Sequence, residues 1–412
     1  MPIDKPERRK STEWGSNINL ALLLLGAFAG IFQIAGSVGF GAGFEMVALG
    51  QNLAASGNYA NPFVVLKTGP TAANPPAYPV FLALLNWLLK IPHLVALVAT
   101  AANIFASALI AAWLPRVSRV FYARIEPGVA AAILWAFSFQ LMPAWDTCFT
   151  LALLLLFCIY STTYAGTQKI VTVALISGAI VALLFLFNPS TLLIVLPWIA
   201  YQLAIRKWSI KQSIVMVAAM AILILPWVGR NYIQLGAFVV RTNFGMTLYS
   251  SNNDCAEPSL LADEARGCYQ THHPNTSLNE AELLQRLGEV SYDRLRTADA
   301  MAWIKAHSDY FWQLTWHRFV NFWFPPAEGH PFKAAVIWIT TILSIPGLYL
   351  MIRSRERVTF YAVLVLLMYP VLYYIVVSDV RYRYPILWLS ELPAGYCLWR
   401  AWVNIDRRIH GF

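Results

Sequence analysis

The sequence predicts an all-α polytopic membrane protein, with about ten transmembrane helices and additional short helices on the outer membrane surface. Apolar residues make up 58% of the 412 residues, charged residues make up 12%, and the mean hydropathy is +0.55. Because soluble domains are about 25% charged, this composition excludes an ordinary soluble fold. The long apolar runs lack the alternating pattern of a membrane β-barrel, so the predicted spans are helices.

Stretches of about 17 to 23 mostly apolar residues are long enough to cross a bilayer as helices. Such stretches occur at 17–39, 93–115, 127–143, 146–163, 170–187, 190–205, 211–228, 332–351, 358–377 and 384–402. The first stretch follows the basic run KPERRK and shows no small-residue cleavage site. It is therefore predicted to be a retained anchor rather than a signal peptide.

The formal net charge of +9 is explained by membrane topology rather than by nucleic-acid binding. If the N-terminus is cytoplasmic, 17 of the 30 Lys and Arg residues fall in the short cytoplasmic segments. Cytoplasmic loops of membrane proteins are enriched in these residues, so both ends of the chain are predicted to be cytoplasmic.

The apolar segment YPVFLALLNWLL, at 78–89, is too short to span a bilayer. If it did span, the basic segment RVSRVFYAR would face outside, against the charge bias. We therefore expect an interfacial or re-entrant segment. The outer face then carries a first loop at 40–92. The chain divides into an N-terminal membrane module at 1–228, a large extracytoplasmic loop at 229–331 and C-terminal membrane helices at 332–412.

Glu45 is the one acidic residue of the predicted first outer loop. The segment from Phe44 to Ser56 predicts a short helix that ends at Gly57 in a left-handed conformation. Its apolar side chains are predicted to face the bilayer surface, while Glu45 and Asn52 share another face; the apolar residues are Val47, Leu49 and Leu53.

The segment KTGPTAANPPAYP follows this helix and predicts an irregular, partly rigid loop. A lone carboxylate beside a conformationally costly loop indicates a functional site. The alternative is a solvated acid that the helix dipole favours.

Several motifs, in order along nearly the whole chain, resemble those of the GT-C superfamily of membrane glycosyltransferases. They are Glu45 after the first span, ALGQNLAASGNY, TGPTAANPPAYP, PWVGRNY, NFGMTLYSSNN, and RYRYP before the last span. The similarity is greatest to the bacterial branch with protein O-mannosyltransferases and lipid A aminoarabinose transferases. It implies an enzyme of the bacterial inner membrane that transfers a sugar from a polyprenyl-phosphate-linked donor. The acceptor would be a glycan, lipid or protein on the non-cytoplasmic face.

The resemblance implies that Glu45 is the catalytic carboxylate of the first outer loop, with the role of general base. A carboxylate that takes the proton of an acceptor hydroxyl would assist inverting attack on the anomeric carbon. Asp146, at the outer end of a predicted span, is a second candidate that would orient the acceptor or assist the base. Its alternative role is a helix N-cap. No cofactor is predicted. A divalent metal is the alternative, which the sequence does not support, because many relatives carry Asp-Glu where this chain has Phe44 and Glu45.

Four basic residues of the outer segments are candidates for binding the phosphate of the lipid carrier: Arg230, Arg381, Arg383 and Lys67. If RYRYP is extended, Arg381 and Arg383 point to one side and can grip phosphate oxygens. The alternative is anchoring in the lipid headgroups together with Tyr382 and Tyr384.

Cys255 and Cys268 are the cysteines outside the predicted spans, and in an oxidising compartment they predict a disulfide. A metal site with His272 and His273 is the alternative, although the spacing matches no common zinc pattern.

The segment 278–320 predicts amphipathic helices. Glu391, inside the last span, is left outside the catalytic set.

The sequence contains no phosphate-cradling, serine-elbow, zinc-protease or calcium-loop motif. The competing class is a transporter or flippase of lipid-linked sugars, and within the enzymes a ligase or polymerase of lipid-linked glycans. Transporters tend to show repeated halves and broken helices near the midplane. The polar and Gly/Pro-rich segments of this chain are concentrated on one face, which favours an enzyme.

Overall fold

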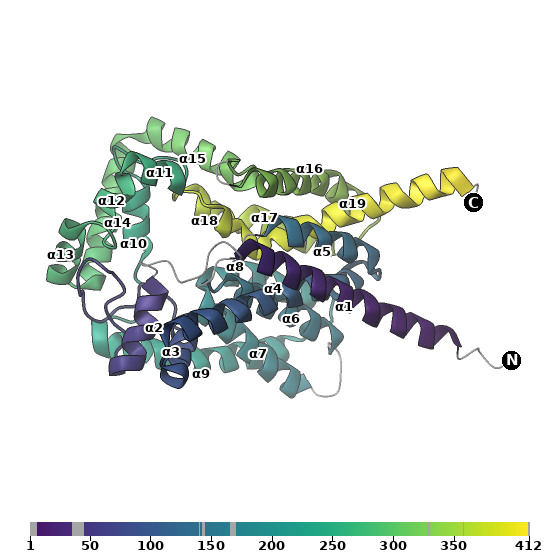
Figure 1. The fold of residues 1–412 in the computed structure, drawn as a ribbon, viewed down its shortest axis with the longest axis horizontal. Helices are drawn as coiled ribbons and strands as arrows, with labels where there is room; N and C mark the ends of the chain where they lie inside the picture. The colour runs from purple at the N-terminus through teal and green to yellow at the C-terminus, as the bar shows by residue number, and fades with distance from the viewer. Residues whose placement is uncertain are drawn as a thin grey trace.

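The computed structural model describes residues 6–34, 45–139, 141, 145–164, 170–327, 330–356 and 358–410. All regular elements of these residues are helical, as the sequence predicts. Figure 1 shows long helices running together through the body of the molecule, with shorter helices gathered at one end. Phe44 and the last residues of the predicted spans 17–39 and 127–143 lie outside the described residues.

The long apolar helices follow the predicted spans in order. They are α1 (Pro6–Ile34), α4 (Pro92–Tyr122), α5 (Glu126–Ser138), α6 (Thr147–Thr163), α7 (Ile170–Phe187), α8 (Leu192–Ala204), α9 (Ile210–Leu235), α16 (Pro331–Arg353), α17 (Val358–Met368) and α19 (Tyr384–His410). Of the described helices, α1, α4, α7, α9 and α16 are long and apolar enough to cross a membrane. The chain is therefore an all-α membrane protein, and its count of ten spans stays a prediction.

One predicted span is not a continuous helix. In 358–377, α17 ends at Met368, and α18 (Val371–Tyr374) begins after Pro370. Proline lacks the backbone N–H that a helix interior requires, which explains the break. The predicted span at 190–205 begins with a short 3-10 turn, η1 (Pro189–Thr191), before α8.

The helix α19 packs closely on α5 and α16, and small residues lie at these contacts. A Cβ atom added to Gly347 would lie 2.0 Å from the carbonyl oxygen of Pro393, and one on Gly395 would lie 2.1 Å from that of Pro127. Small residues allow membrane helices to approach in this way.

The short helices of the first outer loop are α2 (Glu45–Ser56) and α3 (Ala77–Leu89). Gly57 ends α2 with φ +72°, which confirms the predicted stop. The prediction that Leu49 faces the bilayer is wrong, because Leu49 is fully buried. The helix α2 packs closely on α3, where a Cβ atom on Gly50 would lie 2.7 Å from the Cβ atom of Leu82.

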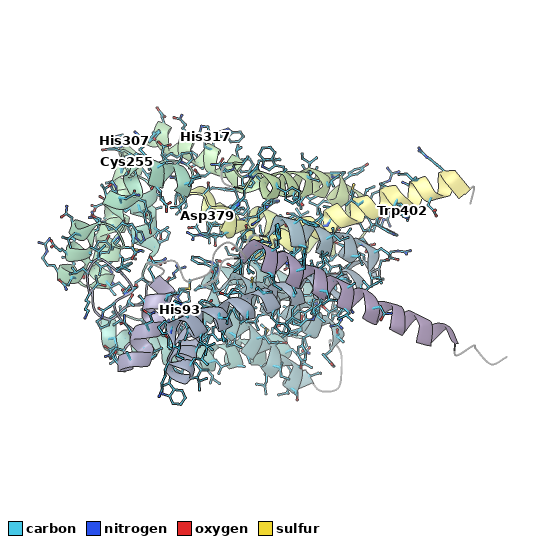
Figure 2. The ribbon with its side chains drawn as sticks, viewed as in Figure 1. His93, Cys255, His307, His317, Asp379 and Trp402 are labelled. Atoms are coloured by element: carbon cyan, nitrogen blue, oxygen red, sulfur yellow. A yellow bond between two sulfur atoms is a disulfide. The ribbon has the colours of Figure 1, made fainter. Side chains whose placement is uncertain are left out.

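The segment predicted to be the large outer loop is also helical. It contains α10 (Phe244–Ser251), α11 (Leu260–Arg266), α12 (Cys268–His272), α13 (Leu278–Leu287), α14 (Glu289–Ala306) and α15 (Ser308–Trp323), and the turn η2 (Val380–Arg383) lies further along the chain. The helices α13, α14 and α15 confirm that 278–320 is helical, but the apolar residues of α14 do not gather on one face as predicted. Cys255 and Cys268 form the predicted disulfide. Cys255 lies at the end of the molecule opposite Trp402 of α19 (Figure 2).

Candidate active site

Glu45, at the first position of α2, lines a cavity of about 370 Å³ between the two outer loops. A second cavity of about 260 Å³ is lined by Asp146. We call them the Glu45 chamber and the Asp146 chamber. They have a common wall formed by Met46, Trp145, Arg241, Asn243, Thr247, Arg381 and Tyr382. The structure therefore brings together two carboxylates that are far apart in the sequence.

The environment of Glu45 suits a proton acceptor. Burial raises its pKa above the ordinary value of 4.5, against the opposing effects of Arg381, Arg241 and a hydrogen bond with Asn74. Its side chain keeps 27% of its surface exposed, and this surface faces the chamber. A carboxylate with a raised pKa is a stronger base at neutral pH than an ordinary glutamate.

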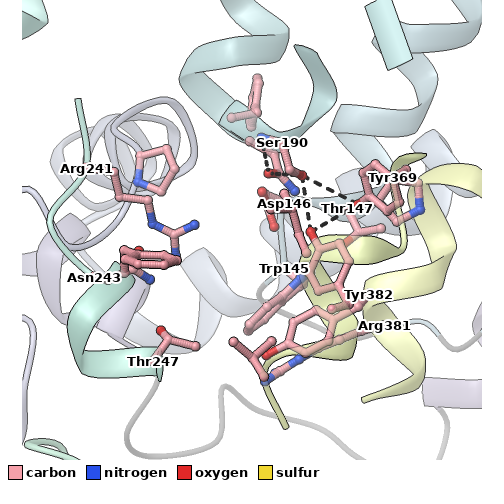
Figure 3. Close-up of a pocket in the computed structure, with 18 of the residues that line it drawn as sticks. Trp145, Asp146, Thr147, Ser190, Arg241, Asn243, Thr247, Tyr369, Arg381 and Tyr382 are labelled. Carbon is pink, nitrogen blue, oxygen red and sulfur yellow. Dashed lines mark hydrogen bonds between the residues drawn. The ribbon is translucent and has the colours of Figure 1, made fainter. Parts of the chain in front are cut away.

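Asp146 immediately precedes α6 and is 6% exposed. Its side chain makes no capping hydrogen bond, so the N-cap alternative finds no support in the geometry. The carboxylate interacts electrostatically with Arg241 and Arg381. Figure 3 shows Asp146, Arg241 and Arg381 arranged around one space.

Arg241 is a site residue that the sequence did not single out. Its Nε atom donates to the carbonyl oxygen of Ala73 at 2.8 Å. Its two terminal nitrogens make no hydrogen bond to the described residues, and Figure 3 shows the guanidinium group pointing toward Asp146. The signal available in the sequence was a basic residue two positions before the motif NFGMTLYSSNN.

Arg381 lines both chambers. Its Nε atom lies 3.3 Å from an oxygen of Asp379, and its guanidinium carbon lies 4.6 Å from the centre of the Trp145 ring. Two arginines thus face a common space, and guanidinium groups suit the oxygens of a phosphate.

The other three predicted phosphate ligands line neither chamber. Arg383 is buried and donates to the carbonyl oxygen of Trp323 at 2.7 Å. It points away from Arg381 because η2 is a 3-10 turn, in which residues two apart do not share a side as they do in a strand. Arg230 bonds to the carbonyl oxygens of Thr71 and Tyr59, at 2.6 and 2.5 Å. Lys67 is exposed.

The Asp146 chamber also contains a cluster of hydroxyl groups. The hydroxyl of Tyr369 lies 3.2 Å from that of Tyr373, which donates to Ser190 at 3.2 Å, and Ser190 donates to Asn188 at 2.8 Å (Figure 3). Apolar side chains complete the wall: Phe187, Leu372 and Val376. Apolar and aromatic walls with a few polar groups are typical of small-molecule sites.

Glu391 lies outside both chambers and accepts a hydrogen bond from Ser138 at 2.8 Å. The alternative metal site at the outer cysteines is not formed, because the two sulfur atoms are joined to each other. Among the described residues, no group of three His, Cys, Asp or Glu side chains is arranged to hold a metal ion.

Comparison of the sequence with protein-family models and with curated proteins finds no match. The similarity is instead structural. The archaeal oligosaccharyltransferase AglB from Archaeoglobus fulgidus, in complex with an inhibitory peptide and a dolichol-phosphate, matches with a TM-score of 0.56 and 12% identity, over 97% of this chain and 52% of that chain. The oligosaccharyltransferase of the same organism in complex with Zn and sulfate matches with a TM-score of 0.57 and 14% identity, over 94% and 50%.

A third structure, of that oligosaccharyltransferase tethered with an acceptor peptide containing the NVT sequon, has a TM-score of 0.55 and 14% identity, over 94% and 50%. The chain thus spans about half the length of these structural neighbours. At such low identity the similarity shows only that the chain shares a fold with these oligosaccharyltransferase structures.

Proposed function

We propose that this protein is a GT-C-type glycosyltransferase that transfers a sugar from a polyprenyl-phosphate-linked donor to a nucleophilic group of an acceptor. The observation that carries the proposal is the placement of Glu45, Asp146, Arg241 and Arg381 around one pair of adjoining chambers. The fold supports it, since the same architecture belongs to an oligosaccharyltransferase that was solved with a dolichol-phosphate.

Each charged group has a role in the proposed reaction. Glu45 takes the proton of the acceptor as the acceptor oxygen forms a bond to the anomeric carbon. The bond between that carbon and the phosphate oxygen breaks on the opposite face, so the anomeric configuration is inverted. Arg241 and Arg381 stabilise the negative charge of the departing phosphate. Asp146 accepts hydrogen bonds from the hydroxyl groups of the sugar and fixes its orientation.

Positive charge at this site comes from the two arginines, whose charges act on both carboxylates. The neighbour that was solved with Zn and sulfate raises the question of a metal here. The proposed reaction assigns the stabilisation of negative charge to Arg241 and Arg381.

The proposed location of the site is the outer face of a bacterial inner membrane, with both termini in the cytoplasm. The arrangement of the helices supports this orientation. The first turn of α1 and the last turns of α19, which carry basic residues, lie at the end of the molecule opposite α2 and α10–α14 (Figure 1).

The test uses the purified protein in lipid nanodiscs with radiolabelled polyprenyl-phosphate sugars. Glu45→Gln keeps the size and polarity of the side chain but cannot accept the proton. The measured rate is that of sugar transfer or, without an acceptor, that of the slow hydrolysis of the donor. We expect Glu45→Gln to lower this rate by about 10²- to 10⁴-fold, while binding of the donor persists. The matched control is Glu282→Gln, which removes an exposed acid of α13.

Equal turnover by wild type and Glu45→Gln would show that Glu45 is not the general base. Turnover by neither protein, together with movement of the carrier across liposome bilayers, would instead identify a transporter.

A further inference from the structure

The segment that follows the Cys255–Cys268 disulfide places an imidazole beside Glu45. His273 directly follows α12 and is 8% exposed. Its Nε2 atom lies 3.9 Å from Oε1 of Glu45, and both residues line the Glu45 chamber. The reaction proposed above gives this histidine no role.

The hydrogen bonds of His273 determine which nitrogen carries its hydrogen. The backbone N–H of Asn275 donates to Nδ1 at 3.1 Å, so Nδ1 carries no hydrogen. Burial lowers the pKa of His273 to about 4, so the ring is neutral at physiological pH. A neutral imidazole without a hydrogen on Nδ1 carries it on Nε2, the atom that faces Glu45.

The ring of His273 is held from both outer loops. It stacks on Tyr269 of α12, with 4.6 Å between ring centres, and meets the edge of Phe63 from the first loop at 6.0 Å. The side chain of Asn275 accepts a hydrogen bond from the backbone N–H of Val64 at 3.2 Å, which ties the histidine segment to the first loop. The direction of the Nε2–H group is therefore set by the packing of two loops.

We propose that His273 is a positioning residue that donates its Nε2–H to the carboxylate of Glu45 and keeps this base ionised and directed at the acceptor. The observed 3.9 Å separation is longer than a hydrogen bond. Catalytic hydrogen bonds are often long in the absence of substrate and shorten when it binds. A hydrogen bond to the ionised form of a carboxylate lowers its pKa, which opposes the effect of burial on Glu45.

The consequence for turnover depends on the proposed function, whereas the ionisation of Glu45 can be measured without turnover. The other charged or titratable groups that line the chamber remain unchanged in a His273 variant: Tyr269 from α12, Asp263 and Glu264 from α11, and Arg241, Arg381 and Tyr382 from the outer segments. A change in the pKa of Glu45 in such a variant is then due to the imidazole.

The experiment uses the full-length protein in nanodiscs that contain polyprenyl phosphate, so that the carrier occupies the site, and a hydrophobic carbodiimide, which reacts with protonated carboxyl groups. Mass spectrometry gives the pH at which modification of Glu45 is half-maximal. His273→Phe keeps a ring without a donor, and His273→Gln keeps a donor. The control is His272→Gln, since His272 lines neither chamber. Thermal unfolding of each variant checks its folding, and His273→Met replaces His273→Phe if the phenylalanine variant does not fold.

We expect the midpoint in His273→Phe to lie at least one pH unit above that of the wild type, which is about a tenfold change in the protonation equilibrium. His273→Gln is expected between the two, and His272→Gln at the wild-type value. The acidic limb of the pH–rate profile for sugar transfer is expected to move in the same direction, with the KM for the donor unchanged.

An unchanged midpoint in His273→Phe, with wild-type transfer intact, would overturn the role of His273 and leave the proposed function standing. A raised midpoint in a protein that transfers no sugar would support the action of His273 on Glu45 and reject the proposed function.

Discussion

The Nε atom of Arg241 donates to the carbonyl oxygen of Ala73 at 2.8 Å. Asn74, which follows Ala73 in the sequence, forms a hydrogen bond with Glu45. One short stretch of the first outer loop therefore orients both a guanidinium group and the proposed base. The conformation of this loop sets the distance between the group that would bind phosphate and the group that would activate the acceptor.

Replacing the guanidinium group of Arg241 should weaken donor binding. Arg241→Lys keeps the charge but cannot make two parallel hydrogen bonds to a phosphate. Loss of one charged hydrogen bond of about 1.5–3 kcal/mol predicts a KM for the donor that is about 10- to 100-fold higher. Steady-state kinetics with polyprenyl-phosphate sugars measure this effect, with Arg286→Lys on the exposed face of α13 as the control. An unchanged KM for the donor would show that Arg241 does not contact its phosphate.

Neutralising Glu45 should stabilise the folded protein at neutral pH. The folded-state pKa of Glu45 is raised above 4.5, so the ionised carboxylate lowers stability above the folded pKa, and this cost disappears below pH 4.5. Glu45→Gln is therefore expected to have a higher Tm than the wild type at pH 7.5. The difference should shrink as the pH falls toward 4.5. Thermal unfolding in nanodiscs across this range measures it, and a lower Tm for Glu45→Gln at pH 7.5 would contradict the prediction.

Glu289 should be required for the connection between the two outer loops. This buried carboxylate accepts hydrogen bonds from the backbone N–H of Ala72, at 2.7 Å, and from the hydroxyl of Thr242. Glu289→Ala leaves both donors unpaired, which predicts a loss of about 1–3 kcal/mol in the free energy of unfolding. Glu289→Gln, which keeps an acceptor, is expected to lose less. Chemical unfolding compares the two variants with Glu282→Ala, and equal stability of all three would argue against the connection.

Gly245 should tolerate no side chain. A Cβ atom there would lie 1.9 Å from the carbonyl oxygen of Asp293, between α10 and α14. Gly245→Ala is expected to lose about 3 kcal/mol or more, because two helix backbones must separate. Gly229→Ala in α9 is the matched control, since a Cβ atom there meets nothing within 4 Å. Tm values of the two variants test this, and similar values would contradict the close contact.

Local signals in the sequence predicted much of the segments that carry α2, α3 and the disulfide. Gly57 ended α2 as expected, because a left-handed glycine is a local requirement of the chain. The short α3 and the Cys255–Cys268 disulfide were also predicted, from length and from cysteine position. Glu45 stood out because it is isolated in an apolar sequence.

The parts of the site that depend on two distant loops could not be predicted. Arg241 and His273 acquire their positions from contacts with the first loop, to Ala73 and to Phe63, and no spacing in the sequence encodes these contacts. The positions of Arg230 and Arg383 outside the two chambers have the same origin. Their guanidinium groups bond to backbone carbonyls that tertiary packing brings to them.

The common wall of the two chambers has a consequence for kinetic experiments. Trp145, Arg241 and Arg381 line both chambers. If the proposed donor and acceptor occupy one chamber each, a substitution at any of these residues changes the surroundings of both substrates at once. The KM values of the two substrates will move together in such variants. Tyr369 lines the Asp146 chamber and Ser250 lines the Glu45 chamber, so these residues can report on one substrate at a time. A pair of variants, one from each chamber, would therefore show which chamber holds which substrate.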